Sequence, residues 1–170
     1  SKYLRDNGYL KRNLSTPTAA DGYAVNQLIN NIPELDSNSC YCNRLQCSHF
    51  SDTSILAEYQ GQVVGFISGY HKPQAPETLF VWQVAVSQNA RGCGLATQML
   101  LQLLASEANR SVSHVETTIT ADNVASWALF TRLADQCNAS LEKALMFDRA
   151  THFNDKHDSE LLVRIGPLHH

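Results

Sequence analysis

The most informative stretch of the chain is one in which an apolar run leads through a glycine-bearing turn into a helical pattern. Residues 79–86 form an apolar run rich in β-branched and aromatic side chains, which predicts a buried strand. After a polar connection over residues 87–90, Arg91, Gly92 and Gly94 precede leucines at helical spacing that continue to about Ala108. The pattern therefore predicts a strand followed by a helix, with both glycines at the transition.

The remaining apolar and polar positions predict further elements on both sides of this stretch. Apolar residues that recur at helical spacing after a capping residue predict helices, and alternating or clustered β-branched residues predict strands. Helices are expected over residues 17–31, residues 40–50 and from the cap at Asp122-Asn123 to about Cys137. Strands are expected over residues 9–14, 54–59, 62–70, 112–120, 143–147 and 161–165.

Two local features refine this pattern. Gly61 lies between two predicted strands, where it can supply the positive φ of a hairpin turn, and residues 73–76 are expected to form a loop. The first helix is expected to begin with the cap Ser15-Thr16 before Pro17. Its core-facing side chains are expected to be Ala24, Val25, Leu28 and Ile29.

The order of the elements is typical of an α+β fold. It runs strand, two helices, three strands, helix, strand, helix and two strands, which predicts a mixed central sheet of about six to seven strands flanked by about four helices. No repeat or linker divides the chain, so we expect a single domain over residues 1–170 with its core at about residues 9–165.

Composition narrows the class of protein. The net charge of -3 gives no basic footprint for nucleic acid, and 44% apolar residues is an ordinary globular value. No apolar run approaches the roughly 20 residues that span a membrane, and the first residues lack the apolar segment of a signal peptide. A cytoplasmic protein is expected.

The five cysteines favour reduced thiols over a disulfide framework, because the number is odd and the chain is long enough to fold without cross-links. Cys40, Cys42, Cys47 and His49 lie close together, but their spacing matches no common zinc pattern. Scattered thiols are therefore the expectation, and no metal is predicted.

The glycine turn is suited to holding an anion. The first N–H groups of a helix have no partner inside it, and the helix dipole favours negative charge at that end. Glycine lets the backbone approach a ligand, and Arg91 adds a cation whose fork suits phosphate oxygens. An ordinary tight turn with a surface arginine is the alternative. The spacing matches neither a Walker loop nor a full dinucleotide fingerprint.

The turn resembles the acyl-CoA loop of the GCN5-related N-acetyltransferases (GNAT), whose signature Arg/Gln-x-x-Gly-x-Gly/Ala opens a helix after a strand. The segment Arg91-Gly92-Cys93-Gly94-Leu95-Ala96 follows that signature without departure. The resemblance implies acetyl-CoA as co-substrate, with its pyrophosphate on backbone amides and its pantetheine arm paired to the preceding strand like an added strand. The implied contact residues are Val84, Ala85, Val86, Arg91, Gly92, Gly94, Leu95, Ala96, Thr97 and Asn123.

A later helix carries a second, looser likeness and one departure. Asn123, Ala125 and Phe130 resemble the family's Asn-x-x-Ala-x-x-Leu-Tyr helix, which implies that Asn123 lies beside the pantetheine. Many members have a tyrosine at the position of Phe130, used as the acid that protonates the leaving thiolate. Phe130 cannot donate a proton, so another residue or water must do so.

Five separate blocks of the sequence carry a more specific likeness, namely residues 35–42, 64–70, 78–86, 116–123 and 162–167. Together they resemble a narrower group of this family, the L-2,4-diaminobutyrate acetyltransferases of ectoine biosynthesis. The resemblance implies transfer of an acetyl group to the terminal (N4) amine of L-2,4-diaminobutyrate by direct attack of the amine, in a homodimer. An acetyltransferase for another small diamine or amino acid, and a non-catalytic acyl-CoA-binding sensor, remain as alternatives.

The residues offer groups that a diamino acid requires, namely anions or carbonyls for its cations and donors for its carboxylate. Glu116 is the candidate base, directly or through water, on the strand face shared with Val112, His114 and Thr118; the alternative is a surface carboxylate. Asp36 is the candidate for binding a substrate ammonium; the alternative is a cap or turn residue.

Three further side chains are candidates. Trp82 is expected to line the substrate site, with a core position as the alternative. Tyr41 is expected to orient the substrate or to donate a proton, with simple packing as the alternative. His157 is expected to close over the substrate carboxylate, with a solvated loop histidine as the alternative, and Arg44 is more typical of an exposed helix arginine than of a carboxylate partner.

Overall fold

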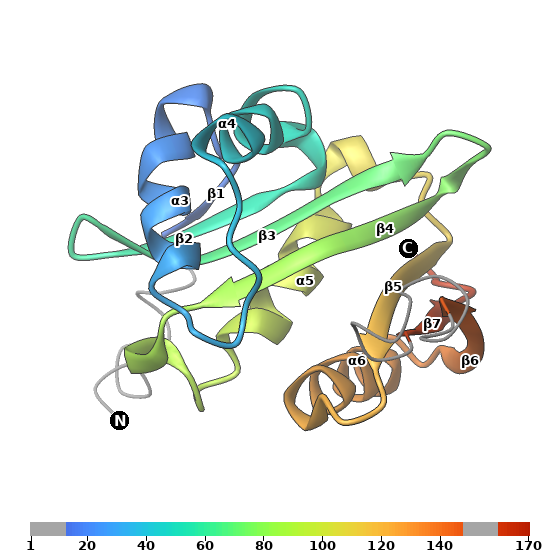
Figure 1. Ribbon diagram of the computed structural model, residues 1–170. Helices are drawn as coiled ribbons and strands as arrows, with labels where there is room; N and C mark the ends of the chain where they lie inside the picture. Colours follow the sequence, from blue (N-terminus) through green and yellow to red (C-terminus); the bar gives the residue numbers. More distant parts are fainter. Residues whose placement is uncertain (1–12, 148–159) are drawn as a thin grey trace. The chain divides into compact units, whose positions relative to one another are not determined.

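The structure, a computed structural model, describes residues 13–147 and 160–170, and its elements follow the predicted order (Figure 1). The helices of the described part are α3 (Gly22–Asn30), α4 (Cys40–Ser48), α5 (Leu95–Ala105) and α6 (Val124–Gln136). Its strands are β1 (Leu14–Ser15), β2 (Ile55–Tyr59), β3 (Gln62–Lys72), β4 (Ala75–Val86), β5 (His114–Thr120), β6 (Ser140–Phe147) and β7 (Glu160–Gly166).

The strands form a seven-stranded sheet in the order β1-β2-β3-β4-β5-β7-β6. The pair β4–β5 is parallel, whereas β1–β2, β2–β3, β5–β7 and β6–β7 are antiparallel. The predicted mixed sheet of an α+β fold is confirmed. By its internal contacts the chain divides into two compact units, one comprising the residues up to Tyr70 with Val81–Arg110, the other His71–Phe80 with Ser111–His170.

The first unit is covered by helices on both sides of its strands. The register of β2 and β3 places Leu56 opposite Phe66 and Ala57 opposite Gly65. Because successive side chains of a strand point to opposite faces, these two pairs lie on different faces of the strands. Leu56 and Phe66 join the core cluster beneath α3, which also includes Val25, Leu28, Ile29, Ile32, Cys47 and Ala85. On the face of Ala57 and Gly65, a Cβ added at Gly65 would lie 2.9 Å from Met99 Sδ of α5. These two small residues therefore allow α5 to pack close to the strands.

The hairpin between β2 and β3 forms as predicted, because Gln60 (φ 52°) and Gly61 (φ 78°) both adopt positive φ. The expected loop over residues 73–76 is wrong in its extent. The strands continue to Lys72 and resume at Ala75, which leaves only two residues in the turn. Pro76 is tolerated near the start of β4, where it is exposed and a ladder N–H is not required.

The start of the first helix also differs from the prediction. A 3-10 turn (Ala19–Asp21) precedes α3, and the N–H of Thr18 donates to Asp21 Oδ2 at 2.7 Å, so Thr18 rather than Ser15 or Thr16 is the capping residue. Ala24 is exposed, at the edge of the face that buries Val25. A Cβ at Gly22 would lie 2.6 Å from Arg44 Cγ, so glycine permits the close approach of α3 and α4 seen in Figure 1.

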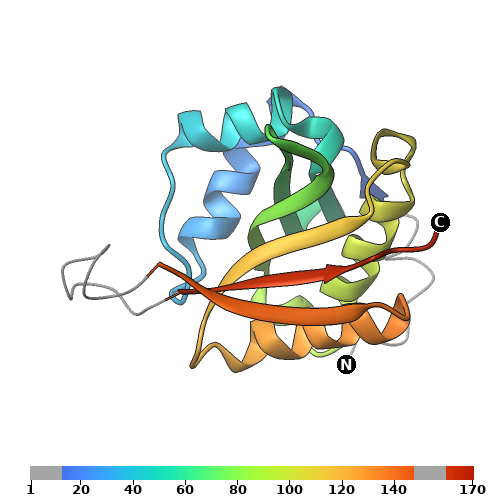
Figure 2. The ribbon, with the colours of Figure 1, turned by 90° about the vertical axis from the view of Figure 1, so that its right-hand side faces the viewer.

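In the second unit β7 lies between β5 and β6, and α6 packs against β6 (Figure 2). The predicted cap of α6 is confirmed, because Asn123 Oδ1 accepts a hydrogen bond from the N–H of Ser126 at 3.2 Å. Phe130 of α6 is 2% exposed. Among the described residues, no helix has the length and apolar character that crossing a membrane requires.

The N-cap of α4 predicts the effect of one substitution on stability. Ser39 Oγ accepts a hydrogen bond from the N–H of Cys42 at 3.0 Å, and an N-cap serine typically stabilises by about 1 kcal/mol. We expect Ser39→Ala to lower the free energy of unfolding in urea by about that amount with an unchanged m-value. Ser37→Ala, at an exposed position of the same loop, serves as the control. Equal stability of the two variants would contradict the assigned cap.

Candidate functional site

The glycine turn between β4 and α5 adopts the backbone geometry that an anion cradle requires. Gly92 (φ 80°) and Gly94 (φ 77°) are both left-handed, and Gly94 is the N-cap of α5. A Cβ at either position would meet no atom within 4 Å, so the backbone is open on that side. The N–H of Gln98 donates to the Gly94 carbonyl at 3.1 Å, and the N–H groups before it have no acceptor inside the helix.

The inner side of the turn is anchored to the protein. Cys93 is 7% exposed, and its Sγ donates to the carbonyl of Ala90, which is fully buried, at 3.0 Å. Thr97 is 4% exposed, and its Oγ1 has no hydrogen-bond partner among the described residues. The turn is therefore fixed on its inner side by the buried Cys93 and Ala90, and its open side exposes the backbone of Gly92 and Gly94.

Arg91 is held at the edge of this turn. Its Nε donates to the carbonyl of Val86 at 3.2 Å, which ties the side chain to the end of β4. One of its terminal nitrogens lies 3.5 Å from Glu34 Oε2. The guanidinium keeps further N–H donors for a ligand, and Glu34 is an exposed competitor for them.

Trp82 of β4 lies on a cluster of aromatic rings in the first unit. Its ring is perpendicular to those of Phe50 and Tyr70, at centroid distances of 6.2 and 6.0 Å. Trp82 remains 47% exposed. Its ring is therefore held by contacts with Phe50 and Tyr70 but remains accessible, and Trp82 is not a core residue.

Asp36 and Tyr41 lie in the segment that links α3 to α4. Asp36 is exposed, and its carbonyl accepts a hydrogen bond from Gln83 Nε2 at 3.4 Å. Ser39, not Asp36, caps α4. Tyr41 in the first turn of α4 is 71% exposed, so its ring is not packed into the core. Arg44 on the same helix is exposed, as expected.

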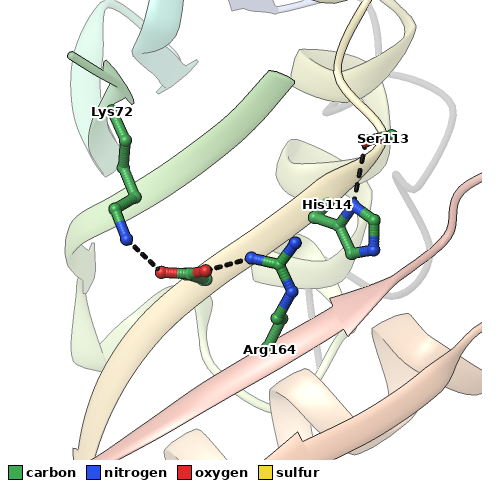
Figure 3. Close-up of polar contacts among 5 residues, drawn as sticks. Lys72, Ser113, His114 and Arg164 are labelled. Carbon is green, nitrogen blue, oxygen red and sulfur yellow. Dashed lines mark hydrogen bonds and ion pairs between the residues drawn. The ribbon is translucent and has the colours of Figure 1, made fainter. Parts of the chain in front are cut away.

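Glu116 of β5 is buried between two cations of the second unit (Figure 3). Its residue exposure is 3%, so it is not a surface carboxylate. Lys72 Nζ donates to Oε1 at 2.8 Å, and the guanidinium of Arg164 donates to Oε2. Arg164 is the cross-strand neighbour of Glu116 on β7. Both carboxylate oxygens therefore have a charged partner.

The charge of Glu116 is set by opposing effects. Burial raises the pKa of the carboxyl group, but hydrogen bonds from Lys72 and Arg164 and their positive charges outweigh it, so the pKa is lowered overall. Glu116 is consequently ionised at neutral pH. Figure 3 also shows His114 on the same strand, whose Nδ1 lies 2.9 Å from Ser113 Oγ.

Sequence reasoning did not identify Lys72 and Arg164. The signal for Arg164 was a single cation within the apolar run of the final strand, flanked by Val163 and Ile165, both fully buried. Lys72, at the end of β3, carried no comparable signal, because a lysine at a strand end is ordinarily solvated.

The residues expected to form the site lie in the first unit, in the second unit or outside the described residues. The residues expected to bind acyl-CoA from Val84 to Thr97 belong to the first unit, as do Asp36, Tyr41 and Trp82. Glu116 and Asn123 belong to the second unit. The end of β4 contains Val84, Ala85 and Val86, of which Ala85 is fully buried. The first turn of α5 contains Leu95 and Ala96. His157 lies outside the described residues.

The cysteine-rich segment forms no metal centre within residues 13–147 and 160–170, where no group of three or more His, Cys, Asp or Glu side chains is placed to hold an ion. Cys47 is fully buried in the core cluster. Burial, and secondarily the charge of Asp21, raises the pKa of its thiol to about 12. Cys47 is therefore a protonated core residue.

Comparison with known proteins places these features in a family. The model of the acetyltransferase (GNAT) family matches residues 24–134. The L-2,4-diaminobutyric acid acetyltransferase of Methylotuvimicrobium alcaliphilum is 53% identical over 155 residues, which cover 91% of this chain and 90% of that protein. The enzyme of the same name from Vibrio parahaemolyticus is 53% identical over 150 residues, 88% of this chain and 82% of that protein.

A solved structure gives the same result. The diaminobutyrate acetyltransferase EctA of Paenibacillus lautus, in complex with its substrate L-2,4-diaminobutyric acid and coenzyme A, is 38% identical with a TM-score of 0.87. The match covers 92% of this chain and 95% of that one. The chain therefore belongs to the acetyltransferase (GNAT) family and, within it, to the L-2,4-diaminobutyric acid acetyltransferases.

Proposed function

We propose that this protein transfers the acetyl group of acetyl-CoA to the terminal (N4) amine of L-2,4-diaminobutyrate and so makes N4-acetyl-L-2,4-diaminobutyrate for ectoine biosynthesis. The observation that carries the proposal is the similarity over 92% of the chain to an enzyme solved with both diaminobutyric acid and coenzyme A. The glycine turn supports it independently, because its open backbone suits a phosphate-bearing ligand.

The acyl donor is proposed to lie along the end of β4 and across the N-terminus of α5. Backbone N–H groups from Gly92 to Thr97 would bind the pyrophosphate, each charge-assisted bond contributing about 1.5–3 kcal/mol. Arg91 would add its charge at the edge. The backbone of Val84–Val86 would pair with the pantetheine arm as an added strand, and Asn123 would contact the same arm.

The amine is proposed to attack the thioester directly. With a lysine-like pKa of about 10.4 for the terminal ammonium, its deprotonation at pH 7 costs on the order of 4–5 kcal/mol. The nitrogen forms the new bond to the carbonyl carbon, the carbon–sulfur bond breaks, and the thiolate of CoA leaves and takes up a proton. Tyr41 is the candidate donor of that proton, since its phenol is accessible and Phe130 has no proton to give. No covalent enzyme intermediate is required.

The diamino acid is proposed to contact the exposed groups of the first unit. Asp36 supplies a carboxylate for an ammonium, and the accessible face of Trp82 supplies an aromatic surface that favours cations. His157, which lies outside the described residues, is proposed to close over the substrate carboxylate. The protein is further proposed to be a single domain that functions as a homodimer, which the same resemblance supports.

Glu116 is proposed as the proton acceptor, directly or through a water molecule. The lowered pKa keeps it ionised but makes the carboxylate a weak base. Both of its oxygens already accept hydrogen bonds from cations, which favours the route through water over direct contact with the amine. Its ion pairs with Lys72 and Arg164 suggest a second role in holding the second unit together. The two roles predict different outcomes for Glu116→Gln.

Substrate preference tests the proposed function directly. We expect acetyl transfer to L-2,4-diaminobutyrate to exceed that to ornithine, lysine and 2,3-diaminopropionate by about tenfold or more in kcat/KM, because each methylene shifts the amine from the thioester. NMR of the product assigns the acetylated nitrogen. Preference for another amine would favour the wider diamine alternative, and acetyl-CoA binding without any turnover would favour the sensor.

The glycine turn offers a substitution with a matched control. Gly94→Ala and Gly61→Ala add a Cβ at nearly the same φ, 77° and 78°, and neither Cβ would meet an atom within 4 Å. Both are expected to lose about 1–2 kcal/mol of stability from backbone strain. Only Gly94→Ala is expected to raise KM for acetyl-CoA, by about tenfold, because its Cβ would occupy the open side of the turn where the phosphates are proposed to bind. Equal KM values would contradict the cradle.

The lowered pKa of Glu116 makes its contribution to stability depend on pH. A group whose pKa is lowered by folding stabilises above its unfolded pKa of about 4.3, and this contribution is lost as pH falls through the folded value. We expect Glu116→Gln to reduce the free energy of unfolding at pH 7 by about 1–3 kcal/mol. The difference from the wild type is expected to shrink in denaturation series below about pH 4.

The same variant distinguishes the two roles of Glu116. If the carboxylate accepts the proton, kcat falls by about 100-fold or more at pH 7 and recovers in part as the pH approaches the pKa of the amine. Unchanged kcat with reduced stability would assign Glu116 to structure alone. Glu142→Gln is the control, since Glu142 is an exposed carboxylate paired across the strands with the same Arg164.

A further inference from the structure

The first unit contains a chain of side-chain amides that connects its two N-terminal helices. Asn26 Nδ2 of α3 donates to Asn43 Oδ1 of α4 at 2.9 Å, and Asn43 Nδ2 donates to Gln46 Oε1 at 2.8 Å. Asn43 is fully buried, Gln46 is 1% exposed and Asn26 is 7% exposed. Buried amides that satisfy one another fix a single arrangement, because an unpaired one would lose its hydrogen bonds to water.

This chain of amides extends to the segment that carries Asp36. Asn26 Nδ2 also donates to the backbone carbonyl of Asn38 at 2.8 Å. Asn38 Nδ2 in turn donates to Gln83 Oε1 on β4 at 2.7 Å. Gln83 Nε2 then donates to the backbone carbonyl of Asp36 at 3.4 Å.

Gln83 therefore uses both ends of its amide on the same short segment. Its oxygen accepts from the side chain of Asn38, and its nitrogen donates to the backbone of Asp36. Residues 36–38 are fixed at three points, two of them by Gln83. A glutamine is required for this pattern, since a carboxylate cannot donate and an aliphatic side chain does neither.

The two hydrogen bonds that Gln83 forms with Asn38 and Asp36 are called the anchor here. The position of Gln83 places this anchor next to the proposed substrate contacts. Gln83 follows Trp82 directly on β4, and Tyr41 lies in the first turn of α4, only three residues after Asn38. The anchor thus joins the strand that carries Trp82 to the segment that carries Asp36 and leads into Tyr41. Since Asp36 and Tyr41 are both exposed, packing alone does not fix their positions.

We propose that Gln83 is a positioning residue for the diamino acid, acting through its two hydrogen bonds to residues 36–38 so that Asp36 and Tyr41 are held in place relative to Trp82. The inference rests on the proposed function and deepens it, because it assigns substrate affinity to a residue that need not touch the substrate. No member of the anchor is ionisable, so its effect is independent of pH between about 5 and 9.

Three variants test the anchor from both of its sides. Gln83→Leu removes both hydrogen bonds. Gln83→Glu keeps the acceptor for Asn38 but sets a carboxylate oxygen against the Asp36 carbonyl, and Asn38→Ala removes the loop side of the contact. Gln62→Leu, at an exposed position of β3, is the control. Circular dichroism establishes which variants fold.

The expected result is a change in one KM. KM for L-2,4-diaminobutyrate rises about tenfold in Gln83→Leu, while KM for acetyl-CoA stays within about twofold of the wild type. The other two anchor variants shift the same constant in the same direction, at every pH between about 6 and 9. The double variant Gln83→Leu/Asn38→Ala is no worse than Gln83→Leu, because both act on one contact.

Other outcomes overturn the inference. An unchanged KM for diaminobutyrate in any folded anchor variant contradicts it, and so does an equal rise in both KM values. A loss of thermal stability with normal kinetics assigns the amides to packing alone. Failure of the wild-type protein to acetylate diaminobutyrate is a separate result, which rejects the proposed function and with it this use of Gln83.

Discussion

The left-handed backbone at the end of β4 is the constraint on which the proposed chemistry depends. Gly92 and Gly94 both require positive φ, which other residues adopt at a cost of about 1–2 kcal/mol. These two residues turn the chain immediately before α5, whose first N–H groups have no acceptor inside the helix, and the space beside both glycines is open. The turn is tied to the core by the hydrogen bond from Cys93 to the Ala90 carbonyl, and both residues are buried. The cradle is therefore a property of the backbone, and the side chains mainly hold it in place.

The two units differ in the kind of polar groups that they bury. In the second unit, Glu116 is buried with a cation on each oxygen, and removing the carboxylate would leave Lys72 and Arg164 facing each other. In the first unit, the polar core is built from neutral amides, so no charge is desolvated around Asn26 and Asn43. Of the two arrangements, only the charged cluster around Glu116 makes stability depend on pH.

The sequence was sufficient for the features that depend on neighbours along the chain. The order of elements, the hairpin at Gly61 and the Asn123 cap all follow from local patterns, and the structure has each of them. It was insufficient where distant segments meet. Lys72 and Arg164 lie 44 and 48 positions from Glu116, so their pairing depends on strand register. Gln83 was missed for the same reason, since a lone polar residue in a strand carries no local signal of its partners.

The contrast between charged and neutral polar clusters also determines how the protein responds to salt. Lys72 and Arg164 are each 37% exposed at the side chain, so dissolved ions can reach them, and the screening length falls to about 3 Å at 1 M ionic strength. Hydrogen bonds between amides carry no net charge and are screened far less. Rising ionic strength therefore weakens the ion pairs around Glu116 before it affects the anchor at Gln83. A protein with this division keeps the segment around Asp36 in place over a wide range of salt concentrations.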